Sequence, residues 1–115
     1  MFLVADAAQP AVKVTAAAKY HTWAYGVNVR NGDEVRWADC DRYPSTTNCN
    51  LVQQVINPDW GLVPHCQKAG QAAGGNPNWL AVDVYYPGSI GLWTTGWMAS
   101  YYIDYPGSVL PIPWC

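Results

Sequence analysis

The sequence predicts a single all-β domain, a small barrel or sandwich held together by two disulfides. Three observations predict this fold class. Across 115 residues, about five to seven short apolar runs alternate with turn-forming residues. No stretch shows the long 3.6-residue periodicity that is typical of an amphipathic helix. The four cysteines form an even set, as a disulfide framework requires.

The N-terminal region differs from the rest of the chain. Residues 1–12 are rich in alanine, contain Pro10 and have no periodic pattern, so we expect them to be disordered. The segment 1–7 resembles the end of a signal peptide with an A-x-A cleavage site, which would indicate export. An ordinary disordered N-terminus is the alternative. The folded domain is then expected over residues 13–115.

Turn-forming residues delimit the expected strands. Alternating or continuous apolar runs predict strands at 23–29, 35–38, 51–56, 62–67, 79–86 and 92–98. Between them we expect a turn at 31–33, a loop of about eleven residues at 68–78, and a turn at Pro87-Gly88. A proline-rich tail follows the last of these strands and leads to Cys115.

The cysteine spacing favours one of the three possible pairings. Cys40 and Cys49 flank a polar segment with Pro44 at its centre, which predicts a loop that is easily closed by a bond between them. A bond between Cys66 and Cys115 would hold a tail that would otherwise fray. We therefore favour Cys40–Cys49 with Cys66–Cys115. No pair has C-x-x-C spacing, so disulfides in an oxidising, extracellular setting are expected rather than a metal or redox site.

Charge and hydropathy exclude some partners. Charged residues make up 12% of the chain, and the net charge is −2. With six scattered Lys and Arg residues there is no basic patch to neutralise phosphates, so no nucleic-acid partner is expected. No apolar run approaches the roughly 20 residues of a membrane-spanning helix, so no membrane insertion is expected either.

The aromatic composition favours a binding surface. The chain has seven Trp and eight Tyr but one Phe, and Trp and Tyr are the rings that suit contact surfaces exposed to water. We expect Trp23, Trp79 and Trp97 in the core, whereas Trp37 fits either place. The candidate binding residues are those in predicted loops and near predicted turns: Tyr43, Trp60, Tyr85, Tyr86 and Trp93.

Catalysis is not expected. The sequence has two histidines, His21 and His65, with no G-x-S-x-G motif and no His pair at metal-binding spacing. Asp83 and Asp104 could form a carboxylate pair, but single surface carboxylates are far commoner. His65 fits a pH-sensitive contact or, more simply, a strand residue that faces solvent. We expect no cofactor and no metal.

Four motifs stand in register between about residues 20 and 103. They are Asn28-Val29-Arg30, Val63 with Cys66-Gln67 and Gly70-Gln71, Trp79-Leu80-Ala81-Val82, and Gly96-Trp97-Met98-Ala99-Ser100-Tyr101-Tyr102-Ile103. In that order they resemble the bacterial SH3-like (SH3b) family, in the form found in small exported actinobacterial domains.

This resemblance implies a small SH3-like barrel and a role in binding peptides of the cell wall. We therefore expect an exported, non-catalytic module that recognises a peptide through an aromatic groove. The alternative is a free-standing exported protein that binds another protein, as an inhibitor or as a subunit of an exported assembly. In that case the loop between Cys40 and Cys49 would be the presented element.

Overall fold

The computed structural model describes residues 20–88 and 93–115, so the predictions for 1–12 and for the start of the domain lie outside the described residues. The fold is all-β, as predicted. Its elements are β1 (Val27–Asn31), α2 (Trp37–Arg42), β2 (Leu51–Ile56), β3 (Gly61–Ala73), β4 (Asn76–Tyr85), β5 (Trp93–Ala99) and a 3-10 helix, η1 (Ser100–Tyr102).

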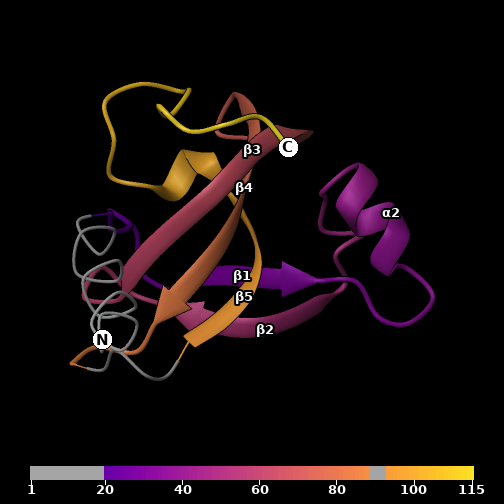
Figure 1. Cartoon of the computed structure of the whole chain (residues 1–115), viewed down its shortest axis with the longest axis horizontal. Coiled ribbons are helices and arrows are strands. Elements are labelled where there is room, and N and C mark those ends of the chain that lie inside the picture. The colour runs from indigo at the N-terminus through magenta and orange to yellow at the C-terminus, as the bar shows by residue number, and fades with distance from the viewer. Residues whose placement is uncertain (1–19, 89–92) are drawn as a thin grey trace, which may run out of the picture.

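The five strands form one antiparallel sheet in the order β2-β1-β5-β4-β3. The sheet is not closed, because β2 and β3 lie at its two ends. The long β3–β4 hairpin crosses the layer made by β1, β2 and β5 (Figure 1). Between these two layers lies the main core.

The outer edge of β3 is covered by segments from both ends of the described chain. Tyr20 bridges to Leu62, and Trp114 bridges to Gln67 in parallel. Residues 104–115, which we call the tail, thus lie against the same strand that also carries Cys66 (Figure 1). An edge covered in this way presents few free backbone groups to another chain.

Both predicted disulfides are confirmed. Cys40 bonds to Cys49 and Cys66 bonds to Cys115. The first closes residues 40–49, which we call the disulfide loop. This loop begins within the last turn of α2 and lies with α2 at one side of the sheet (Figure 1). The second bonds the tail to β3.

The core has two parts. The main cluster is built from strand residues that face inward at alternate positions and includes one tail residue: its fully buried members are Val29, Ile56, Leu62, Leu80, Val82, Val84 and Met98, with Leu110 almost as deep. A second cluster packs Trp79, Trp97 and Ala99 around the first disulfide. The prediction that Trp79 and Trp97 are core residues is therefore confirmed.

The placement of Trp23 in the core was wrong. β1 begins at Val27 rather than at residue 23, and the preceding residues form a bend. The Trp23 ring is about half exposed; its Nε1 donates to the Tyr101 carbonyl, and its ring packs edge-on against the Tyr101 ring. Within the alternation at 23–29, Val27 and Val29 therefore belong to β1 as predicted, whereas Trp23 contacts η1. Trp37, which fitted either place, is exposed.

The predicted long loop at 68–78 is instead a hairpin. β3 continues to Ala73, β4 begins at Asn76, and these two residues pair with each other. Gly74 and Gly75 both have positive φ, 56° and 81°, which a two-residue hairpin turn requires and glycine adopts without strain. Two adjacent glycines between strand-forming residues are themselves a hairpin signal. The many loop-forming residues in this segment favoured a long loop instead.

The predicted strand at 35–38 is also wrong, because this segment leads into α2. Asp33 Oδ1 accepts hydrogen bonds from the backbone N–H groups of Val35 and Arg36, and the Asp33 carbonyl accepts from Trp37. A side chain that satisfies free N–H groups in this way favours a helical turn over an extended strand.

Candidate binding cleft

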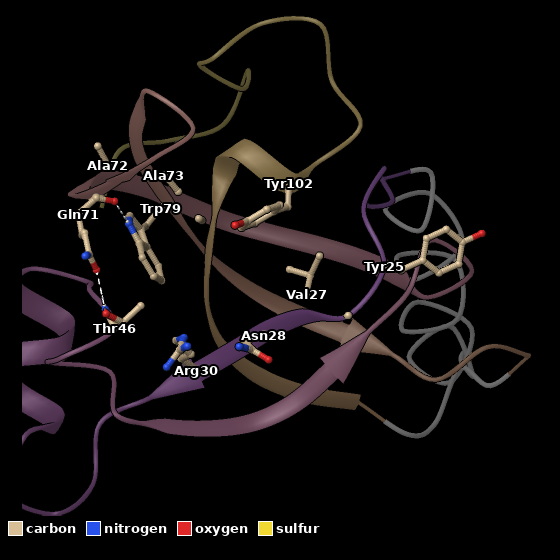
Figure 2. Close-up of a pocket in the computed structure, with 12 residues that line it drawn as sticks. Tyr25, Val27, Asn28, Arg30, Thr46, Gln71, Ala72, Ala73, Trp79 and Tyr102 are labelled. Carbon is tan, nitrogen blue, oxygen red and sulfur yellow. Dashed lines mark hydrogen bonds between the residues drawn. The ribbon is translucent and has the colours of Figure 1, made fainter.

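A cleft of about 310 Å³ lies between β1, η1 and the turn end of the β3–β4 hairpin. Figure 2 shows its lining residues spread along its length, with Thr46 and Gln71 at one end and Tyr25 at the other. The described residues that line it are Tyr25, Gly26, Val27, Asn28, Arg30, Thr46, Gln71, Ala72, Ala73, Trp79, Ala99 and Tyr102.

All four motifs of the family resemblance contribute to this cleft. The first supplies Asn28 and Arg30 from β1, and the second supplies Gln71 from β3. Trp79 comes from the third motif, and the fourth contributes Ala99 and Tyr102. Residues that are up to 74 positions apart in sequence thus meet in one place, from Asn28 to Tyr102.

The disulfide loop forms one wall of the cleft and is held to β3 through Gln71. The Gln71 N–H donates to the Pro44 carbonyl (2.9 Å), and its side-chain Oε1 accepts from the Thr46 N–H (2.8 Å). Gly70 makes this approach possible, because a Cβ there would clash with the Pro44 carbonyl oxygen and the Trp79 ring. The loop is therefore placed by hydrogen bonds to the backbone and side chain of Gln71, as well as by the disulfide.

Aromatic rings line the rest of the cleft. The Trp79 indole donates to the Gln71 carbonyl (2.7 Å), which fixes the ring beside the disulfide loop. The Tyr102 ring packs against those of Tyr101 and Trp23, at centroid distances of 5.1 and 6.1 Å. Tyr25, 80% exposed, stands at the far end. Rigid rings of this kind give a ligand contact area at low entropic cost.

Arg30 brings the single charge among the described lining residues. Its Nη1 donates to the Cys49 carbonyl across a long distance of 3.3 Å. Gly96 lets β5 approach at this point, since a Cβ there would lie 2.8 Å from the Arg30 carbonyl oxygen.

The five predicted binding residues do not line this cleft. Four of them, Trp60, Tyr85, Tyr86 and Trp93, gather elsewhere: the Trp60 and Tyr86 rings lie edge to face at 5.0 Å, and those of Tyr85 and Trp93 lie 6.0 Å apart. Three of the four line a smaller hollow of about 230 Å³ with Gln54 and Thr94. Tyr43 lies apart, exposed on the disulfide loop.

Two of these five rings are not the exposed contacts that were expected. Trp60 and Tyr85 are buried, each 9% exposed, because Trp60 joins the main core and Tyr85 packs with Val63. Burial, and to a lesser degree the neighbouring Asp83 charge, raises the pKa of the Tyr85 hydroxyl. Tyr86 and Trp93 are more than half exposed, as expected.

A second and more open cleft, of about 400 Å³, lies on β3, β4 and β5 beside the Cys66–Cys115 disulfide. Its polar groups already bond to one another: Lys68 Nζ donates to the Asp41 carbonyl (2.7 Å), and Trp97 Nε1 donates to the Asp41 carboxylate (3.0 Å). The groups that could recognise a ligand are thus engaged in holding α2 to the sheet.

The polar cluster around Asp83 joins a hydroxyl and an imidazole to one carboxylate. The Thr95 hydroxyl and the His65 imidazole both contact the Asp83 carboxylate, at 2.6 and 2.9 Å. In a Ser-His-Asp triad the imidazole lies between the hydroxyl and the carboxylate, so this arrangement differs from a triad. In the described residues, no group of three His, Cys, Asp or Glu side chains is placed to hold a metal ion.

The part of the chain that the structure describes contains no helix long and apolar enough to cross a bilayer. A comparison with protein-family models, curated protein sequences and solved structures found no match to this chain. The geometry of the cleft therefore carries the functional proposal.

Sequence reasoning missed Arg30, Gln71, Trp79 and Tyr102 as cleft residues. All four stood within the quoted motifs, but they were read as parts of strands or of the core. For Arg30 and Gln71 the signal that could have found them is residue type, since polar side chains are mostly exposed and Arg30 is one of six Lys and Arg residues in the chain. The two aromatic residues carried no such signal, because Trp and Tyr are common in strands. Loop position alone favoured the other aromatic residues.

Proposed function

We propose that this protein is a secreted, non-catalytic module that binds a peptide, such as a peptide of the cell wall. The cleft that Arg30 lines is the proposed binding site. The observation that carries the proposal is the composition of that cleft: Tyr102 and Tyr25 offer rigid apolar contact area beside the largely buried Trp79 ring, while Arg30 and Gln71 offer hydrogen-bond donors. A few placed polar groups among aromatic rings are typical of ligand sites.

Secretion is supported by the two disulfides, which persist in oxidising compartments. The resemblance to SH3-like cell-wall modules supports a peptide ligand, because the motifs that carry it are the ones that line the cleft. A low content of charged residues suits a ligand that is recognised by ring contacts and hydrogen bonds.

Sedimentation with purified cell walls tests the proposal. We expect the protein to pellet with the walls and Tyr25→Ala to weaken its binding about tenfold, the effect of losing a ring at a binding hot spot. Tyr43→Ala is the matched control, since it removes a second exposed tyrosine outside the cleft. Failure to pellet with any of several wall types would refute the cell-wall ligand.

A protein partner that binds the disulfide loop is the second candidate, and one observation favours it. Three large apolar side chains are exposed on the segment around α2, which stands out from the sheet in Figure 1: Val35, Trp37 and Tyr43. Exposed apolar groups that project together often mark a protein contact. In a pulldown from culture supernatant, this function predicts a partner that Tyr43→Ala loses and Tyr25→Ala keeps.

A further inference from the structure

Arg30 is a cation with unused hydrogen-bonding capacity. A guanidinium has five N–H donors in a planar fork, and the bond of Nη1 to the Cys49 carbonyl, at 3.3 Å, is long. The residue is partly buried at the floor of the cleft, so water reaches it from the cleft side (Figure 2). A charged group in this position is stabilised when an anion supplies the missing acceptors.

No acidic residue supplies those acceptors within the described part of the chain. The salt bridges found there join Arg42 to Asp39 and His65 to Asp83, and neither involves Arg30. Nearby carboxylates have other partners. Asp41 accepts from Trp97, and Asp33 accepts from Asn50 and from backbone N–H groups. The described residues that line the cleft include no Asp or Glu.

The surroundings of Arg30 strengthen an ionic contact. Trp79 and Tyr102 exclude part of the water from the cleft, and Coulomb attraction grows as the effective dielectric constant falls. Gln71 also lines the cleft. Its Oε1 accepts hydrogen bonds from Thr46, while its side-chain NH₂ has no partner among the described residues. An anion bound by Arg30 would thus have a neutral donor nearby and apolar rings alongside.

We propose that the cleft recognises a free carboxylate on its peptide ligand, bound in bidentate fashion by the Arg30 guanidinium, with the adjoining side chain of the peptide against Trp79 and Tyr102. A carboxylate fits the planar fork of an arginine with two parallel hydrogen bonds. The inference rests on the proposed peptide-binding function and adds the chemical group that the site selects. The carboxylate can belong to the C-terminus of the peptide or to an Asp or Glu side chain.

The test uses the intact protein with both disulfides formed and three small probes. They are N-acetyl-alanyl-alanine, the C-terminal amide of the same dipeptide, and N-acetyl-aspartyl-alanine amide. Each is titrated into labelled protein while NMR follows the Arg30 Nε–H and the Trp79 indole N–H signals. We expect the free acid to bind at least tenfold more tightly than the amide. Recovery of that affinity by the aspartyl amide would identify a side-chain carboxylate as sufficient.

Variants separate Arg30 from a general charge effect. Arg30→Gln should abolish the preference for the acid over the amide, and Arg30→Lys should keep part of it, because lysine retains the charge without the fork. Arg42→Gln is the matched control: it removes one positive charge from an exposed side chain outside the cleft, and it should bind like wild type. Thermal unfolding of each variant shows whether it is folded.

The wild-type comparison decides the matter even if a variant unfolds. Equal affinity for acid and amide would overturn the carboxylate inference and leave peptide binding in place. If neither dipeptide shifts the Arg30 or Trp79 signals, the carboxylate inference is refuted, and the separate wall-sedimentation assay then reports on peptide binding itself. Binding of the acid that is unchanged in Arg30→Gln would refute the assignment to Arg30.

Discussion

The disulfide loop and the tail each carry a disulfide and each contact a glutamine of β3, yet they are held differently. Cys66–Cys115 bonds the tail to β3, whereas Cys40–Cys49 closes the loop on itself. Gln67 is fully buried; its Nε2 donates to the carbonyls of Leu110 and Ile112, and its Oε1 accepts from the Leu110 N–H. Gln71, four residues further along the strand, is exposed and holds Thr46 from the solvent side.

Under the proposed binding function, this difference separates an attachment that stabilises the core from an attachment that shapes the cleft. The tail contributes Leu110 to the main core, so it is part of what makes the sheet stable. The disulfide loop packs around its own small cluster and contributes Thr46 to the wall of the cleft. A surface that must admit a ligand gains from an attachment that water can reach, whereas a buried attachment serves the core.

The largest expected effect comes from removing the tail disulfide. Cys66→Ser with Cys115→Ser opens a loop of 49 residues' separation, and the chain-entropy model gives a loss of about 4 kcal/mol in the free energy of unfolding. Urea unfolding without reductant measures it. A loss smaller than that of the other disulfide would contradict the view that the tail is the stabilising attachment.

Removal of the disulfide in the loop should lower the free energy of unfolding by less, but it should weaken peptide binding by more. Cys40→Ala with Cys49→Ala frees a span of 9 residues' separation, for which the same model gives about 3 kcal/mol. Because this loop forms a wall of the cleft, the affinity of this double variant for the peptide probe should also fall. The variant without the tail disulfide, once refolded, should bind normally. Titrations on both double variants at a temperature where each is folded compare them directly.

The two glutamines provide the next comparison. Gln67→Met should lower the free energy of unfolding by about 2 kcal/mol, because buried N–H and C=O groups of the tail lose their partners. Gln71→Met, at the exposed position, should cost about 1 kcal/mol or less. Equal losses in denaturant unfolding would show that burial does not distinguish the two attachments.

The smallest effect concerns pH at the start of α2. A hydrogen bond from Asn50, followed by the backbone N–H of Arg36, lowers the pKa of the Asp33 carboxyl below its ordinary value. A group whose pKa is lower in the folded state adds stability above its unfolded pKa, and that contribution is lost as pH falls through the folded pKa. As the pH falls from the unfolded pKa of about 3.9 through the lower folded pKa, wild type should therefore lose more thermal stability than Asp33→Asn. Thermal unfolding of both proteins over that pH range measures the difference.

Local signals predicted the fold well where a segment's own residues determine it. The strand at 51–56 has the predicted bounds, and the cysteine spacing predicted both disulfides. Prediction failed where a contact between residues distant in sequence determines the local structure. The helical turn before Trp37 depends on Asp33, which Asn50 holds in place, and the exposed ring of Trp23 depends on η1. The site was missed for the same reason, since its residues converge only through the crossing of the β3–β4 hairpin over β1.

The unequal spacing of the two disulfides has a consequence for how the reduced chain folds. Cys40 and Cys49 meet by closing a short span, an event that is fast and needs little prior order. Cys66 and Cys115 must wait until β4 and β5 have formed and the tail has reached Gln67. During that interval Cys66 is exposed to exchange with the earlier pair, so oxidative refolding should pass through a one-disulfide species and be limited in rate by the docking of the tail.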